Sequence, residues 1–138
     1  MKNIILILLV MCATIANAQY STSSKGDGIE FLSERTFKNK VDNSRDITVV
    51  EFYAEWNAYN QCNYLKKLKD CNVYRVNIDE QPLIARKYEV KVVPTLIIFN
   101  GGKLVEKYEA NLMFQAEGKF SYEGVQKKIE KIILEKFQ

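Results

Sequence analysis

The chain of 138 residues contains no histidine. Without imidazole there can be no histidine metal ligand, no Cys–His nucleophile and no Ser–His–Asp triad, so these kinds of site are excluded. Cysteine is also scarce, with Cys12, Cys62 and Cys71 the only three. We expect Cys12 to be removed with a leader segment, and two thiols are fewer than a thiolate metal site requires. The sequence therefore predicts no metal site and no cofactor.

Charge of one sign is not in excess either. The chain has 20 Lys and Arg residues against 17 Asp and Glu, which gives a formal net charge of +3. The two signs alternate along the chain, and no basic run is interleaved with aromatic residues. A nucleic-acid partner would require such a basic patch, so we expect none.

The N-terminus has the pattern of a signal peptide over residues 1–18. Lys2 precedes an apolar run over residues 4–13, and Ala16-Asn17-Ala18 supplies small residues at a cleavage site before Gln19. An uncleaved membrane anchor is the alternative, but the run is shorter than the ~20 residues that a spanning helix needs. We therefore expect an exported protein with no membrane anchor after cleavage. A flexible lead-in would cover residues 19–28, and one domain would cover residues 29–138.

The rest of the chain predicts an α/β domain with a mixed central sheet flanked by helices, in the order β-α-β-α-β-α-β-β-α. β-branched, aromatic or alternating runs predict strands at residues 47–54, 73–78, 95–99 and 103–108. Composition and spacing predict helices at residues 33–41, 57–69 and 81–88, and from residue 121 to the C-terminus. Asn100-Gly101-Gly102 indicates a hairpin turn between the last two strands.

Serines and a proline mark three helix starts. Ser33 and Ser121 are expected N-caps, and Pro82 is expected in a first turn, where its missing N–H costs least. The last helix carries apolar residues at three- and four-residue spacing, so they should form one stripe against the sheet. The stripe consists of Val125, Ile129, Ile132, Ile133 and Phe137.

Four segments, at residues 49–56, 75–79, 87–95 and 99–103, resemble the thioredoxin family in order and at nearly the family's spacing. The resemblance covers about residues 29–137 and implies the thioredoxin fold. In thioredoxins the first segment runs into Trp-Cys-Gly-Pro-Cys. Here the corresponding residues are Trp56-Asn57-Ala58-Tyr59-Asn60. Asn57 and Asn60 thus stand at the redox positions, and the dithiol of an oxidoreductase is missing.

The resemblance also implies roles for individual residues. Pro94 would be the family's cis-proline, preceded by Val93, whose backbone pairs in the family with an extended peptide. Trp56 and Tyr59 would complete this peptide-binding surface. Glu51 would be the family's buried acid and Arg75 its basic partner, and we expect a structural role because no resolving cysteine is present for Glu51 to serve.

Asn57 itself has no titratable group and cannot form a mixed disulfide, whereas asparagine is a good residue at a helix start. We therefore expect Asn57 to cap the helix predicted at residues 57–69.

Cys62 and Cys71 could in principle replace the missing dithiol. Nine residues apart along one helix, they would lie roughly 13 Å from each other, beyond the ~7 Å that a disulfide allows between Cα atoms. Cys62 also aligns with Leu65 and Leu68 on an apolar stripe. Three alternatives stay open: two non-catalytic thiols, which we favour, a disulfide that requires an early helix break, and a reactive Cys62.

Two functions follow. The favoured hypothesis is a non-catalytic binding or chaperone-like module, with a protein or extended peptide as the unidentified partner. The alternative is a thiol–disulfide oxidoreductase of altered motif that uses Cys62 with or without Cys71. By resemblance to small exported thioredoxin-like proteins, the periplasm is the expected location rather than the exterior of the cell.

Overall fold

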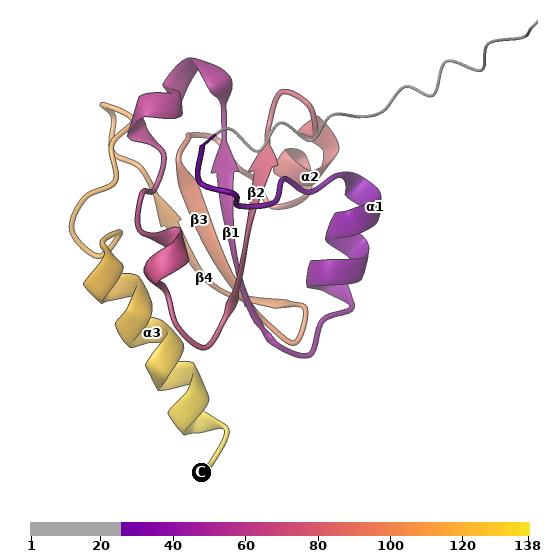
Figure 1. Cartoon of the computed structure of the whole chain (residues 1–138), viewed down its shortest axis with the longest axis vertical. Coiled ribbons are helices and arrows are strands. Elements are labelled where there is room, and N and C mark those ends of the chain that lie inside the picture. The colour runs from indigo at the N-terminus through magenta and orange to yellow at the C-terminus, as the bar shows by residue number, and fades with distance from the viewer. Residues whose placement is uncertain (1–25) are drawn as a thin grey trace, which may run out of the picture.

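A mixed four-stranded sheet forms the centre of the domain (Figure 1). The computed structural model describes residues 26–138, so the predicted signal peptide and residues 19–25 of the lead-in lie outside the described part. The strands are β1 (Ile47–Tyr53), β2 (Asn72–Asn77), β3 (Thr95–Asn100) and β4 (Lys103–Glu109). Their order is β2-β1-β3-β4; β1 is parallel to β2 and antiparallel to β3, and β4 is antiparallel to β3. The prediction of a mixed α/β sheet is confirmed.

Helices cover both faces of this sheet. They are α1 (Glu34–Phe37), which continues into a π-helical turn (Lys38–Asp42), α2 (Pro82–Lys87) and α3 (Tyr122–Glu135). Residues of α1 and α2 share one apolar cluster, and residues of α3 belong to a second cluster on the other face. Figure 1 shows α1 and α3 on opposite sides of the strands.

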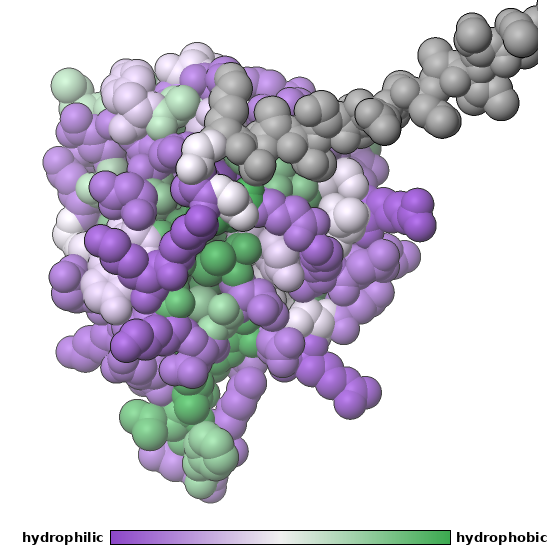
Figure 2. Space-filling view, viewed as in Figure 1, coloured by the Kyte–Doolittle hydropathy of each residue, from purple (hydrophilic) through white to green (hydrophobic). Residues whose placement is uncertain are grey.

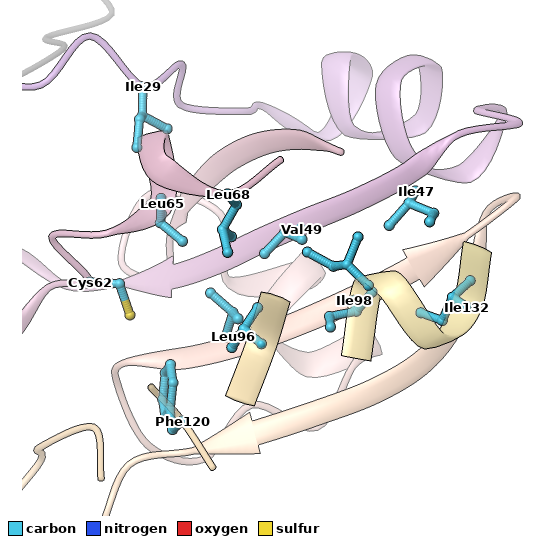
Figure 3. Close-up of a cluster of buried hydrophobic side chains, with 12 residues drawn as sticks. Ile29, Ile47, Val49, Cys62, Leu65, Leu68, Leu96, Ile98, Phe120 and Ile132 are labelled. Atoms are coloured by element: carbon cyan, nitrogen blue, oxygen red, sulfur yellow. The ribbon is translucent and has the colours of Figure 1, made fainter. Parts of the chain in front are cut away.

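The two clusters follow from the alternation of side chains along the strands. Val49 of β1 and Ile98 of β3 point toward α3, as Figure 3 shows, whereas Phe52 and Phe99 point toward α1 and α2. Every residue of β1 is buried, as expected for a central strand with a helix layer on each side. This double burial explains why the strand reads as a nearly continuous apolar run.

The expected helix starts are confirmed, but the end of the last helix is not. The Ser33 side chain accepts from the Thr36 N–H, the Ser121 side chain accepts from the Gly124 N–H, and Pro82 occupies the first turn of α2. The stripe prediction is wrong for Phe137, which is exposed because α3 ends at Glu135, before the chain reaches it.

Three other elements differ from the prediction. The strand that opens the predicted order, ahead of the helix predicted at residues 33–41, is reduced to a single bridge between Phe31 and Arg75. Asp27, in the predicted lead-in, forms an ion pair with Arg75. The helix predicted at residues 57–69 is wrong: two short 3-10 helices, Glu55–Asn60 and Leu65–Lys67, stand there instead.

The surface in the view of Figure 2 is mostly hydrophilic, with hydrophobic residues gathered along a central band and at the lower end where the chain terminates. Leu134 and Phe137 are exposed at that end. Within residues 26–138, no helix is both long enough and apolar enough to cross a bilayer.

The hairpin between β3 and β4 offers a test of the packing. Gly102 has φ +76°, and a Cβ there would lie 2.2 Å from the Asp42 carbonyl oxygen, whereas a Cβ at Gly101 (φ +59°) would meet nothing within 4 Å. Gly101→Ala should lower the free energy of unfolding by about 1–2 kcal/mol, the cost of the left-handed backbone alone. Gly102→Ala should cost clearly more, because backbone atoms must also move. Urea denaturation measures both, and equal losses would contradict the close contact.

Candidate functional site

A buried ion pair joins Glu51 and Arg75, and Glu51 lines a small pocket together with Asn57, Val93 and Pro94. The two residues face each other in the β1–β2 register, and both side chains are fully buried. Arg75 Nε donates to Glu51 Oε2 at 2.6 Å, and Arg75 Nη1 donates to Asp27 Oδ2 at 2.6 Å. Burial raises the pKa of the Glu51 carboxyl, and the adjacent guanidinium limits that rise. The structure thus brings Glu51 and Arg75 together as partners.

This ion pair also explains why no continuous α-helix forms at residues 57–69. Both main-chain groups of Cys62 are bound by the pair: its N–H donates to Glu51 Oε1 at 2.5 Å, and its carbonyl accepts from Arg75 Nη2 at 3.0 Å. An α-helix needs the same two groups for its own ladder. Gln61, with φ −58° and ψ 151°, is accordingly extended, and the helix is interrupted.

Removal of Arg75 should therefore be costly. In Arg75→Met the stem is kept, but the Glu51 carboxylate loses its charge partner and the Cys62 carbonyl loses its donor. We expect a loss of about 3–5 kcal/mol in the free energy of unfolding, typical of a broken buried pair. The control is Lys40→Met, which breaks the more exposed pair with Glu30 and should cost less than about 1 kcal/mol. Similar losses in urea denaturation would contradict a structural role for Arg75.

The two thiols lie in different surroundings and are not bonded to each other. Cys62 is buried with Leu65 and Leu68 in the cluster beneath α3 (Figure 3). Burial, and then the nearby Glu51 carboxylate, raise the pKa of Cys62 far above its usual value. Burial and Asp70 raise the pKa of Cys71 to about 11. Nucleophilic attack requires the thiolate, so neither residue is prepared for it at neutral pH.

Alkylation of the folded protein tests these shifts. At pH 8 a thiol with a pKa near 11 is roughly one-thousandth thiolate, whereas free cysteine is roughly one-quarter thiolate, so Cys71 should react with iodoacetamide roughly 200-fold more slowly than free cysteine. Its rate should rise about tenfold for each pH unit below that pKa. Cys62 should react only after unfolding in urea. Mass spectrometry of tryptic peptides separates the two, and fast labelling of native Cys62 at pH 8 would support the reactive-thiol alternative.

Asn57 is the centre of a hydrogen-bond network. Its side chain is buried, and its Nδ2 donates to the Val93 carbonyl at 2.9 Å and to the Phe114 carbonyl at 3.2 Å. Its Oδ1 accepts from Asn60 Nδ2 at 2.8 Å. The expected cap role is wrong: Asn57 lies inside the first 3-10 helix with φ −119° and ψ 24°, and its side chain reaches across the site. The chain thus replaces two thiols with two linked amides.

The Val93–Pro94 peptide bond is cis, as the resemblance implied. Both residues are buried, however, and the Val93 carbonyl is already bonded to Asn57. The expectation that Val93 and Pro94 form an open peptide-binding surface therefore does not fit this structure. Trp56 and Tyr59, by contrast, are 56% and 85% exposed.

The loop between β4 and α3 adds side chains that sequence reasoning did not assign to the site. The Phe114 ring meets the Trp56 ring edge-to-face, with centroids 5.4 Å apart, and Leu112 and Met113 are exposed beside it in sequence. We call the exposed residues Trp56, Tyr59, Leu112, Met113 and Phe114 the aromatic surface. The available signal was three consecutive apolar residues between the strand predicted at residues 103–108 and the helix predicted from residue 121.

A groove borders this surface between residues 60–64 and 115–122. Uncharged amides and two tyrosines make up much of its lining, among them Asn60, Asn63, Gln115, Tyr64 and Tyr122. Such side chains both donate and accept hydrogen bonds, as a peptide backbone does. Among the described residues, no three His, Cys, Asp or Glu side chains are grouped to hold a metal.

The family model for thioredoxin matches residues 28–119, two-thirds of the chain. The chain belongs to the thioredoxin family. Thioredoxin 1 of Nostoc is 32% identical over 84 residues, which cover 54% of this chain and 77% of that protein. Chloroplastic thioredoxin M4 of Arabidopsis thaliana is 29% identical over 130 residues, 88% of this chain and 62% of that protein. Among solved structures, a mutant thioredoxin from Halobacterium salinarum matches with a TM-score of 0.54 and 24% identity, over 73% of this chain and 87% of that chain.

These matches establish the thioredoxin fold and family that the sequence resemblance indicated. The solved structure, at 24% identity, supports the fold alone. The chemistry of the site comes from the residues of this chain, where amides occupy the two redox positions.

Proposed function

We propose that this thioredoxin-family protein is a non-catalytic binding or chaperone-like module that holds a protein or extended peptide on the aromatic surface. The observation that carries the proposal is the Asn57 network: the amides at the two redox positions are linked to each other and to backbone carbonyls. No thiol is available there, while large apolar side chains beside the network remain exposed. Exposed aromatic residues of this kind are typical anchors of protein interfaces.

The bordering groove supports a peptide rather than a charged small molecule as the ligand. Amide side chains such as Asn63 and Gln115 can bond a peptide backbone without selecting its sequence. Glu117 is the one charged residue among the described residues that line the groove. Apolar anchors beside mostly neutral donors and acceptors would accept many unfolded chains, which suits a chaperone-like role.

The compartment proposed for this activity is the periplasm. The N-terminal charge, the short apolar run and Ala16-Asn17-Ala18 support export and cleavage. Burial raises the pKa of both Cys62 and Cys71, so few thiolates are present to react. Two such thiols are compatible with an oxidising compartment.

The alternative is a thiol–disulfide oxidoreductase that uses Cys62, with or without Cys71. Its support is the family itself, since the relatives named above are thioredoxins. Burial of Cys62 argues against it, because the thiol would have to leave the core before it could attack a disulfide.

Precipitation of insulin by dithiothreitol separates the two functions in one measurement. An oxidoreductase accelerates the rise in turbidity, whereas a module that holds unfolded chains delays it. We expect delay at about equimolar protein. Trp56→Ala/Tyr59→Ala should abolish most of the delay, because it removes the two most exposed rings of the aromatic surface.

Leu83→Ala/Phe137→Ala is the matched control, because both side chains are exposed but lie outside the aromatic surface. This variant should delay precipitation as the unchanged protein does. Acceleration that disappears in Cys62→Ser would overturn the proposal and establish the oxidoreductase.

A further inference from the structure

The segment at residues 111–115 is folded on itself. Asn111 Oδ1 accepts from the N–H groups of Met113 at 2.8 Å and Gln115 at 3.1 Å. The Asn111 N–H donates to the Gln115 carbonyl, and the Phe114 N–H donates to the Asn111 carbonyl, both at 2.9 Å. The turn is thus closed by its own hydrogen bonds and does not depend on the sheet for them.

One polar contact joins this turn to the site. Asn57 Nδ2 donates to the Phe114 carbonyl, and within the described part of the chain the other hydrogen bonds of residues 111–115 stay inside the turn. The Phe114 ring adds its edge-to-face contact with Trp56. Leu112, which is 95% exposed, and Met113 add little burial. The turn therefore rests on the site through one carbonyl and one ring.

Asn57 would hold the same orientation without the turn. Its Oδ1 is bonded to Asn60, and one of its two amide N–H groups is directed to Val93. These two contacts fix the plane of the amide, so its second N–H is aimed at the place where the Phe114 carbonyl lies. The Trp56 ring lies beside this position, where it contacts the Phe114 ring. A donor and an aromatic ring in fixed positions form a recognition site for an aromatic residue with a free backbone carbonyl.

We propose that residues 111–115 are an internal substitute for the partner, and that the partner displaces them. The partner segment would place an aromatic side chain against Trp56 and give its own backbone carbonyl to Asn57 Nδ2. Asn57 is then a recognition residue, which binds by a hydrogen bond at the position where a thioredoxin uses a thiol. This assignment rests on the proposed binding function and names the chemistry of the partner.

A synthetic peptide with the sequence of residues 110–116, acetylated and amidated, is the probe. Trp56 is the only tryptophan in the chain, so its fluorescence reports binding directly. Leu112→Gly/Met113→Gly/Phe114→Gly removes the internal competitor and should bind the peptide at least tenfold more tightly than the unchanged protein. Phe114→Ala is a milder variant for use if circular dichroism shows that the triple variant does not fold. We call these two the open-loop variants.

Two controls define the interaction. A peptide with alanine in place of its phenylalanine should not bind, because it cannot fill the position beside Trp56. Asn57→Leu, combined with an open-loop variant, keeps a side chain of similar volume but removes the N–H donor. It should weaken binding of the peptide at least tenfold. Phe137 is also exposed and is remote from the turn in sequence, so Phe137→Ala should leave the affinity for the peptide unchanged.

The proposal is overturned if the folded open-loop variants bind the peptide no better than the unchanged protein, or if binding ignores Asn57. In either case the proposed binding function is retained if the protein still delays insulin precipitation and the delay still requires Trp56. Peptide binding without any such delay would instead retain the recognition by Asn57 and remove the chaperone-like role.

Discussion

The structure depends above all on the ion pair of Glu51 and Arg75. Two charged groups with no solvent contact are tolerated only when their hydrogen-bonding capacity is used, and here it is used by distant parts of the chain. Asp27 comes from the N-terminal segment, and the Cys62 N–H and carbonyl come from the connection between β1 and β2. The pair therefore joins β1 to β2 and holds the start of the domain through Asp27. It also interrupts the helix predicted at residues 57–69.

The interrupted helix determines what the site can do. With Cys62 held by its backbone, its thiol points into the core beneath α3 and is kept protonated. Asn57 lies within the short 3-10 helix that precedes Cys62 and does not cap a helix. Its amide therefore bonds the carbonyls of Val93 and Phe114. A family site built for covalent exchange thus becomes a set of fixed neutral donors beneath exposed aromatic rings.

Much of the fold could be predicted, because its signals are local. β-branched runs indicated β1 and β3, Asn100-Gly101-Gly102 indicated the hairpin between β3 and β4, and Ser33 and Ser121 indicated helix starts. The largest failure, the helix predicted at residues 57–69, has a cause that lies elsewhere in the chain. Residues 57–69 have helical composition, but a buried charge pair elsewhere in the chain takes the backbone groups that the helix would need. The turn at residues 111–115 falls between a predicted strand and a predicted helix, and nothing local indicates that its Phe114 ring contacts Trp56.

The sequence by itself determined the family, the sheet and the absence of thiols and imidazole from the motif, since residue identity and periodicity are enough for these. Only the tertiary structure decided that Asn57 bonds two carbonyls, that Val93 and Pro94 are buried and that the Glu51–Arg75 pair binds both main-chain groups of Cys62. Each of those depends on hydrogen bonds between segments far apart in the chain. Such partners compete for the same donors and acceptors, and the outcome of that competition is settled only when the segments meet.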